Sequence, residues 1–270
     1  MAAATIRATL AAAYERFCMN PVMDVVLSSQ THLTDMRTRL LAGIPTDVTT
    51  VVEIGPGTGL NFPCYPAHVA AVETLSPAAT VPDALMARAA ERRLFVRHNT
   101  YVTSAVAIEK GYLTADDAKR TRTVALAVAK AIGLPETELA DPATVPCVFP
   151  FATGTVPAIA CTLVLCTVPL PLVPWFLAEV VRVLVPESGR YYFMEHVPDG
   201  EVETKSAAWR ALQSVNGYVA CGCDIGRSSV DAVSAALTVV DRASYLDERA
   251  LVRATYGLLV YGSGKAPSAQ

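Results

Sequence analysis

The sequence predicts an α/β protein built on a doubly wound, mostly parallel sheet of seven strands, with an antiparallel hairpin at one edge. Two observations favour this fold class. Short β-branched runs alternate with segments of helical periodicity between Thr50 and Val96, which is typical of parallel strands covered by helices on both faces. The run at 158–168 is almost wholly apolar, as expected of a central strand buried on both sides. We expect one domain over residues 1–270, because this length suffices for one full α/β core.

Extra helices are expected before the first strand, in an N-terminal region over residues 1–48. They are predicted at 5–17 and 23–41. The second carries apolar residues at roughly helical spacing and stops at Gly43 and Pro45.

The alternating core of the fold follows in chain order. Each element is bounded by glycine, proline or charged residues, and the β-branched runs predict strands. The expected strands are 50–54, 69–72, 94–96, 158–168 and 190–197, and the expected helices between them are 81–92 and 175–184.

A longer connection over 98–147 is predicted to be an insertion with a helix at 114–132. Thr114 and Asp117 resemble a capping box, and Gly133 offers a C-cap. We expect this inserted helix to pack over the sheet.

Towards the C-terminus the pattern predicts helices near 207–219 and 229–236 and closing strands at 237–241 and 254–261. Two closing strands joined by a short connection favour an antiparallel hairpin at the sheet edge. The tail 263–270 is expected to fray.

Charge and hydropathy restrict the partners. The formal net charge is -3 and the sequence pI is about 5.8, so no basic field gathers phosphates and nucleic acid is not expected as a partner. Hydrophobic residues make up 52% of the chain, yet the longest apolar runs are broken well before the ~20 residues that a membrane span needs. We expect no transmembrane segment and a small-molecule substrate.

The N-terminal segment and the cysteines indicate a cytoplasmic protein. Residues 1–10 lack the apolar stretch of a secretory signal, whereas Arg7 and Arg16 leave an organellar presequence as the alternative. The 7 cysteines are an odd number scattered through apolar segments, which is typical of reduced thiols. Cys221 and Cys223 are too close-set for a usual zinc pair, and no histidine cluster accompanies them, so we expect no metal site.

A glycine-rich turn directly follows the first strand. Segment 51–59 reads Val-Val-Glu-Ile-Gly-Pro-Gly-Thr-Gly, and glycine lets the backbone approach a ligand at positive φ. Open α/β sheets bind nucleotides at the carboxyl ends of their strands. Glu73, about 20 residues beyond Glu53 at the end of the next expected strand, is suited to accept both ribose hydroxyls. The pattern predicts a site for an adenosine group, with a merely structural turn as the alternative.

A nicotinamide dinucleotide is a second interpretation of the same turn. Such cofactors need the spacing G-x-G-x-x-G and a helix whose N-terminus faces a pyrophosphate. Here the third glycine comes one residue early, and Pro63 and Pro66 interrupt the following segment. The spacing therefore disfavours a nicotinamide oxidoreductase.

The turn and several later stretches resemble a known family. Segment 55–62, Gly-Pro-Gly-Thr-Gly-Leu-Asn-Phe, is similar to motif I of the class I methyltransferases. The stretches at 161–168, 179–186 and 192–197 resemble the methyltransferase-like group that includes the animal thiol methyltransferases. Residues 222–227 are similar to the Gly-Cys element near the C-terminus of that group.

The resemblance covers about 51–96 and 148–227, and it implies a class I, Rossmann-like methyltransferase with S-adenosylmethionine as cofactor. The pattern of the family implies cofactor contacts from the glycine turn, from the second strand and from the end of the central strand. The residues so implied are Glu53, Gly55, Pro56, Gly57, Gly59, Asn61, Glu73, Thr74, Thr162, Leu163 and Leu165.

Departures from the pattern of the family bear on this site. Val156 and Pro157 stand where the group usually has a Phe-Asp pair, and the acid expected a few positions before Pro150 and Phe151 to face the adenine amino group is absent. The adenine edge then rests on backbone groups or on Asp141. Losing one hydrogen bond of about 1 kcal/mol weakens binding roughly fivefold. The hydrophobic membrane anchor of animal members is also missing, so membrane association is not expected.

Methyl transfer from a sulfonium is an in-line displacement that mainly requires alignment and exclusion of water. A thiol acceptor, with a pKa of about 8.5, needs no strong base, whereas a hydroxyl does. Glu195 and His196, at the end of the fifth strand, are the candidates to position or deprotonate the acceptor, and a structural role for His196 is equally open. Cys166 and Cys223 are expected to be packing residues. Aromatic residues that either roof an acceptor pocket or belong to the core are Tyr14, Phe17 and Trp209.

Three functions remain open from these patterns. The first is methyl transfer to a small thiol or a related lipophilic acceptor, and a quinone or lipid methyltransferase is close to it. A noncatalytic binding module with a methyltransferase fold, favoured by Pro157 and the insertion, is the alternative of another class. A nicotinamide oxidoreductase is the weakest, because the glycine spacing opposes it.

Overall fold

The computed structural model describes residues 24, 27–28, 30–198, 223–227, 229–246 and 258–267. The predicted helices 5–17 and 207–219 lie outside the described residues, as do Tyr14, Phe17 and Trp209.

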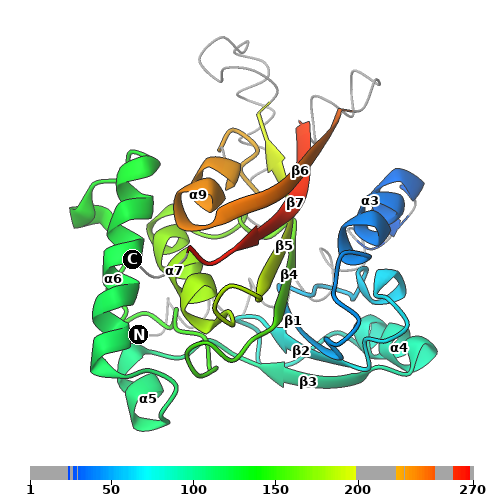
Figure 1. Cartoon of the computed structure of the whole chain (residues 1–270), viewed down its shortest axis with the longest axis horizontal. Coiled ribbons are helices and arrows are strands. Elements are labelled where there is room, and N and C mark those ends of the chain that lie inside the picture. The colour runs from blue at the N-terminus through cyan, green and yellow to red at the C-terminus, as the bar shows by residue number, and fades with distance from the viewer. Residues whose placement is uncertain are drawn as a thin grey trace, which may run out of the picture.

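One sheet of seven strands lies at the centre of the molecule (Figure 1). Its strands are β1 (Thr50–Ile54), β2 (Ala71–Leu75), β3 (Phe95–Asn99), β4 (Ala158–Thr162), β5 (Arg190–Val197), β6 (Thr238–Leu246) and β7 (Leu258–Lys265). The order across the sheet is β3-β2-β1-β4-β5-β7-β6. Strands β1 to β5 are parallel, and β7 is antiparallel to both β5 and β6. The predicted doubly wound, mostly parallel sheet with antiparallel edge strands is confirmed.

The strand order contains a switch point between β1 and β4. From β1 the chain adds β2 and then β3 on one side, and it later returns to add β4 and β5 on the other side. Loops that leave the carboxyl ends of β1 and β4 therefore diverge, and open α/β sheets bind their ligands at such a point.

Two strands differ from their predicted bounds at the central part of the sheet. β2 spans 71–75 rather than 69–72, because residues 71–75 are those in register with β1 and β3. β4 ends at Thr162, although the apolar run continues to Val168. The residues after Thr162 form a turn because their amide groups donate to a side chain of β5, as described below.

Of the C-terminal strands, β6 is longer than predicted and β7 lies further towards the C-terminus than predicted. β7 continues to Lys265, where it pairs with Thr238 of β6. The prediction that the tail 263–270 frays is therefore wrong for 263–265. Ser263 is anchored there, since its amide donates to Asp241 over 2.7 Å.

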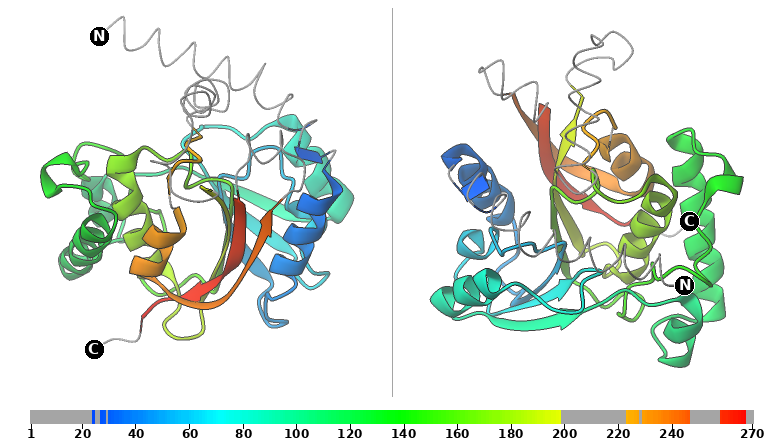
Figure 2. Two further views of the ribbon diagram at one scale, coloured as in Figure 1. Left: turned by 90° about the horizontal axis from the view of Figure 1, so that it is seen from above. Right: turned by 180° about the vertical axis from the view of Figure 1, so that it is seen from behind.

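Helices cover both faces of the sheet (Figures 1 and 2). One face carries α3 (Thr31–Leu41) and α4 (Asp83–Arg92), whose apolar residues share one core with Val51, Val72 and Met194 of the sheet. The opposite face carries α6 (Ala115–Ala131), α7 (Val173–Val183) and α9 (Ser229–Ala236), which share a second core with residues of β1, β4 and β5. The short helices are η2 (Phe62–Cys64), α5 (Ser104–Glu109), η3 (Glu136–Glu138) and η4 (Leu170–Leu172).

The inserted helix α6 begins as predicted, but it packs mainly on other helices rather than directly over the sheet. The Thr114 hydroxyl accepts from the Asp117 amide over 3.1 Å, and the Asp117 carboxylate accepts from the Thr114 amide over 3.3 Å, which completes the capping box. Helix α6 then packs against α7 and α9. The insertion therefore thickens the layer that covers one face of the sheet.

A buried ion pair fixes the end of the insertion to α7. Arg182 donates to Glu179 over 2.6 Å and to the carbonyls of Tyr112 and Phe151 over 2.9 Å each. Glu179 in turn accepts from the amide of Phe149 over 2.8 Å. These two residues of the family-like stretch at 179–186 are accordingly occupied in holding the chain that leads into β4.

Within the described ranges, no helix is long and apolar enough to cross a membrane.

Candidate functional site

The glycine turn leaves the carboxyl end of β1 with all three glycines at positive φ. The φ angles are 61° at Gly55, 51° at Gly57 and 83° at Gly59. A Cβ at Gly55 would lie 2.5 Å from a γ carbon of Val164, and one at Gly59 would lie 3.3 Å from the Cα of Leu85. A Cβ at Gly57 would meet nothing within 4 Å. The outer glycines therefore serve close packing, while the middle one, after the buried Pro56, faces open space.

Glu53 is the centre of a buried polar network beneath this turn. Its carboxylate accepts from Asn61 Nδ2 over 3.1 Å and from the Tyr65 hydroxyl over 2.7 Å. Asn61 Nδ2 also donates to Thr162 Oγ1 over 3.0 Å, which joins the turn to the end of β4. Burial raises the pKa of Glu53 to about 7, although the hydrogen bonds from Tyr65 and Asn61 act in the opposite direction. Three of the predicted cofactor residues are thus brought together by direct bonds.

A clamp that the sequence analysis missed holds the same turn from outside. Asp24 accepts from the Thr58 hydroxyl over 2.5 Å and from Arg88 Nη2 of α4 over 3.0 Å. Arg88 also donates to the Thr58 carbonyl over 2.7 Å. Burial would raise the pKa of Asp24, but the bonds from Arg88 and Thr58 outweigh it and hold that pKa below its usual value. No local signal could predict this clamp, because its members are widely separated in the chain.

Glu73, the predicted acceptor for the ribose hydroxyls, lies within β2 rather than at its end. Glu73 is two residues before the end of β2, because the strand continues to Leu75. Its carboxylate accepts from Asn99 Nδ2 over 3.2 Å and lies 3.8 Å from Arg97 Nη1, both on β3. Thr74 points to the other side of the sheet, where its buried hydroxyl lies 2.9 Å from His98 Nδ1. Glu73 therefore remains near the strand ends and partly exposed, whereas the Thr74 side chain faces away from it.

The loop after β4 is held by Glu195 of β5. Leu163 adopts a positive φ of 60°. The amides of Val164, Leu165 and Cys166 then donate to the Glu195 carboxylate over 3.1, 2.9 and 3.3 Å. Burial raises the pKa of Glu195 to about 7, against the effect of these amides. Both oxygens of Glu195 are engaged, so this geometry gives it the role of fixing the loop rather than that of a general base.

His196 lies between two cysteine thiols that the sequence separates widely. Its Nδ1 is 3.7 Å from Cys166 Sγ and 3.6 Å from Cys223 Sγ, and the two sulfurs are 3.5 Å apart. All three residues are buried, with exposed fractions of 1% for Cys166 and 6% for the other two. The contact with Cys166 and the facing His196 lower the pKa of Cys223, while the same contact and burial raise the pKa of Cys166.

The segment that carries Cys223 is bonded to the loop after β4. The amide of Asp224 donates to the Cys166 carbonyl over 2.9 Å, and Arg227 donates to the Val168 carbonyl over 2.7 Å. One residue from each of three family-like stretches therefore meets the others here, namely Cys166, His196 and Cys223. No local pattern indicates this contact, because Cys166 and Cys223 lie 57 positions apart in the chain.

The departures from the pattern of the family lie away from the glycine turn. Val156 and Pro157 precede β4, and the Pro157 carbonyl accepts from the amide of Arg190 at the amino end of β5. Asp141 is exposed and accepts from the amide of Ala143 in its own turn over 2.9 Å. The residue change at Pro157 therefore removes no group from the carboxyl edge, where Thr162 meets Asn61.

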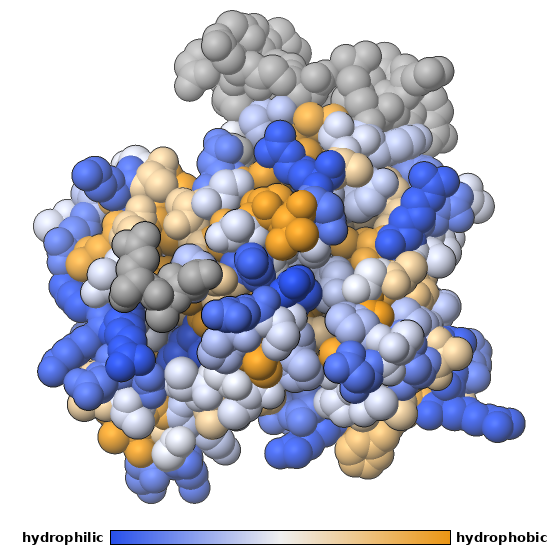
Figure 3. Space-filling model, viewed as in Figure 1, coloured by the Kyte–Doolittle hydropathy of each residue, from blue (hydrophilic) through white to orange (hydrophobic). Residues whose placement is uncertain are grey.

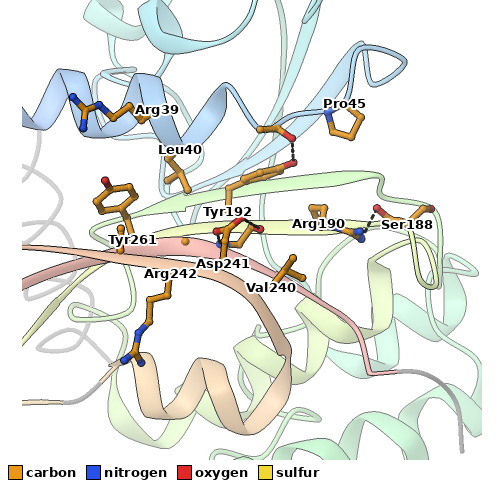
Figure 4. A pocket seen from close by; sticks show the side chains of 14 residues that line it. Arg39, Leu40, Pro45, Ser188, Arg190, Tyr192, Val240, Asp241, Arg242 and Tyr261 are labelled. Carbon is orange, nitrogen blue, oxygen red and sulfur yellow. Dashed lines mark hydrogen bonds between the residues drawn. The ribbon is translucent and has the colours of Figure 1, made fainter.

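A cavity of about 660 Å³ lies on the α3 side of the sheet (Figure 4). Its walls come from α3 and from β5, β6 and β7, and they include Arg39, Arg190, Tyr192 and Arg242. Arg190 begins β5, so this cavity adjoins the amino end of a parallel strand and not the switch point. On the face seen in Figure 3, apolar residues form small groups among polar ones, with no single wide apolar surface.

Comparison with known proteins identifies the fold. No family model matches the chain, and no curated protein sequence matches it. A chain of the complex between the Haloferax volcanii Trm112 methyltransferase activator and a methyltransferase aligns with 94% of this chain and 96% of its own, at 15% identity and a TM-score of 0.51. Geranyl diphosphate methyltransferase in complex with SAM aligns with 90% of each chain, at 14% identity and a TM-score of 0.53. This chain has the class I methyltransferase fold.

The same fold also occurs with another reaction. The [4+2]-cyclase SpnF aligns with 88% of this chain and 82% of its own, at 11% identity and a TM-score of 0.50. A methyltransferase fold therefore does not fix the chemistry, which has to be argued from the site.

Proposed function

We propose that this protein is an S-adenosylmethionine-dependent methyltransferase that acts on a small-molecule acceptor. The observation that carries the proposal is the open space at Gly57, at positive φ and at the switch point of the sheet. A Cβ there would meet no protein atom within 4 Å, so only the positive φ, and no packing against the protein, favours glycine at this position. Such a cradle fits a cofactor that approaches the backbone closely.

Residues around the cradle would hold the cofactor. The backbone of 55–59 would face its methionine and ribose parts, Glu73 would accept from the ribose hydroxyls, and the chain at Thr162 and Leu163 would border the adenine. Glu53 would act from beneath, by fixing Asn61 and the turn. Bound S-adenosylmethionine supplies an electrophilic methyl group, and these residues would orient it and exclude water.

The hydrogen bonds of Glu195 favour a thiol as the methyl acceptor. Both of its oxygens accept amide hydrogens, so it is poorly suited to take a proton from a hydroxyl or phenol. A thiol with a pKa of about 8.5 already provides a useful thiolate fraction at neutral pH. A quinone or lipid acceptor would require another base, and a phenol and a thiol of similar size would distinguish the two classes in a product assay.

Binding of S-adenosylhomocysteine tests the proposal directly. Because a ligand that binds only the native state stabilises it, the melting temperature should rise with ligand concentration. Gly57→Val should abolish this rise by filling the cradle. Gly133→Val is the matched control, since Gly133 also has a positive φ of 72° and open space but lies at the end of the inserted helix. Equal stabilisation of both folded variants would refute the assigned cradle, and product formed from a thiol would exclude a noncatalytic module.

A further inference from the structure

Two sulfur atoms and one imidazole nitrogen converge at the carboxyl ends of β4 and β5. They are the Sγ atoms of Cys166 and Cys223 and Nδ1 of His196, and all lie within 4.8 Å of one another. Among the described residues this is the one group of at least three Cys, His, Asp or Glu side chains with the spacing of a metal site. We infer that Cys166, His196 and Cys223 form a three-ligand site for a zinc ion.

The spacing of the donors agrees with tetrahedral zinc. With Zn–S bonds of about 2.3 Å and Zn–N bonds of about 2.0–2.1 Å, tetrahedral angles place two sulfurs about 3.8 Å apart and a sulfur and a nitrogen about 3.6 Å apart. The observed sulfur–sulfur distance is 3.5 Å, and the two sulfur–nitrogen distances are 3.6 and 3.7 Å. An ion could therefore enter with shifts of a few tenths of an ångström.

The three ligands are also held in place by their surroundings. Cys166 belongs to the loop whose amides Glu195 binds, and His196 is paired within the sheet between β5 and β7. Cys223 is positioned by the bonds of Asp224 and Arg227 to the same loop. Fixed ligands lower the ordering cost of metal binding, and supporting hydrogen bonds of this kind commonly orient metal ligands.

Three protein ligands leave a fourth position, as in catalytic rather than structural zinc sites. The cluster shares the carboxyl edge of the sheet with the glycine turn, because β1, β4 and β5 are parallel. Resting on the function proposed above, we assign the fourth position to the acceptor thiol. The thiol would lose its proton to solvent and bind as a thiolate, which zinc stabilises.

Cobalt titration of the reduced full chain tests the metal site without any methyl transfer. One equivalent of Co²⁺ should give sulfur-to-cobalt charge-transfer bands and the strong visible bands of tetrahedral cobalt, and Zn²⁺ should displace it. Cys166→Ser, His196→Gln and Cys223→Ser should each weaken binding at least tenfold. Cys64→Ser is the matched control, because Cys64 is buried outside the cluster, and it should bind as the parent does. No charge-transfer band in the reduced parent, or equal bands in the cluster variants, overturns the site.

Alkylation of the parent protein provides a readout that does not depend on folded variants. Because both thiols are buried, the labelling is done in mild urea, where the site opens transiently. Zinc should slow the reaction of iodoacetamide with Cys166 and Cys223 more than with the buried Cys64, as mapped by mass spectrometry, and equal rates with and without zinc contradict the proposal. Added 2-mercaptoethanol should alter the cobalt spectrum if the fourth position accepts a thiol, and an unchanged spectrum overturns that assignment. Stabilisation by S-adenosylhomocysteine should persist in Cys223→Ser, so failure of the metal site and failure of the proposed function give different results.

Discussion

Two buried glutamates, Glu53 on β1 and Glu195 on β5, have the same chemistry but opposite kinds of partner. Glu53 accepts from the side chains of Asn61 and Tyr65, whereas Glu195 accepts only from backbone amides in the bonds described above. Side chains can rotate when a ligand binds, but an amide moves only with the backbone. The comparison indicates that the turn after β1 can adjust to a ligand, while the loop after β4 is held rigid by Glu195.

Loss of Glu195 should have the largest effect on stability. Glu195→Ala leaves three amides without their acceptor, and those of Leu165 and Cys166 are buried. Each buried unsatisfied group costs roughly 1–3 kcal/mol, so the free energy of unfolding should fall by about 2–6 kcal/mol. Urea unfolding measures this loss. Glu195→Gln keeps one carbonyl acceptor, so its free energy of unfolding should lie between those of the parent and of Glu195→Ala. A loss below about 1 kcal/mol in Glu195→Ala would contradict the role of Glu195 in holding this loop rigid.

The pH dependence of stability should reveal Glu53 separately. Burial raises its pKa from the ordinary value of 4.5 to about 7 in the folded protein, so the folded state binds the proton more tightly. Proton binding by Glu53 therefore stabilises the folded protein. This contribution is complete below the pKa of the glutamate in the unfolded chain, and it is lost as the pH rises through the pKa of Glu53 in the folded protein. This loss amounts to roughly 3 kcal/mol between about pH 5 and about pH 8.

Glu53→Gln should remove that part of the slope, because glutamine does not titrate. The contribution of Glu195, whose pKa is also raised to about 7, should remain. Urea unfolding of parent and variant across this range gives both slopes. A variant with the slope of the parent would show that Glu53 does not titrate as its burial predicts.

Alanine at the two neighbouring glycines should separate packing from ligand approach. Both residues have positive φ, which costs an alanine about 1–2 kcal/mol, but only Gly55 adds a clash with Val164 in the loop after β4. Gly55→Ala should therefore lose about 1–3 kcal/mol more than Gly57→Ala. Thermal unfolding compares their stabilities, and calorimetry should find weaker S-adenosylhomocysteine binding in Gly57→Ala. Equal losses of stability would mean that the turn and the loop are not tightly packed.

The partly exposed Glu73 provides the smallest expected effect on stability. Its ion pair with Arg97 is solvated, so Glu73→Ala should change the free energy of unfolding by less than about 0.5 kcal/mol. If it binds the ribose, affinity for S-adenosylhomocysteine should fall about 10- to 150-fold, since hydrogen bonds to charged groups contribute roughly 1.5–3 kcal/mol. Arg97→Ala should leave this affinity nearly unchanged. A folded Glu73→Ala protein that binds as tightly as the parent would remove Glu73 from the site.

Local patterns in the sequence predicted those parts of the fold that local interactions determine. The capping box at Thr114 and the β-branched run of β1 act within a few residues, and both were placed correctly. The end of β4 was misplaced because the apolar run at 158–168 gives no sign of the turn after Thr162. That turn depends on Glu195, which lies about thirty positions further along the chain.

The same distinction applies to the candidate site. The three positive-φ glycines were recognisable from spacing alone, because the turn is contiguous. The clamp of Asp24 on Thr58 spans 34 positions, and the sulfur pair of Cys166 and Cys223 spans 57. Contacts of this range depend on how the whole chain folds, so no motif within one segment could predict them.

The bond between Arg227 and the loop after β4 also has a consequence for the order of folding during synthesis. Arg227 donates to the carbonyl of Leu165, which lies 62 positions earlier in the chain. When β5 first leaves the ribosome, Glu195 can already bind the loop, but neither Cys223 nor Arg227 has yet been made. The five parallel strands can therefore assemble before the cysteine and histidine cluster is complete. The later contact between Leu165 and Arg227 closes 62 positions of chain, which adds an entropic cost at that stage. A nascent chain stopped before residue 223 would hold the glycine turn but lack one of the three proposed zinc ligands.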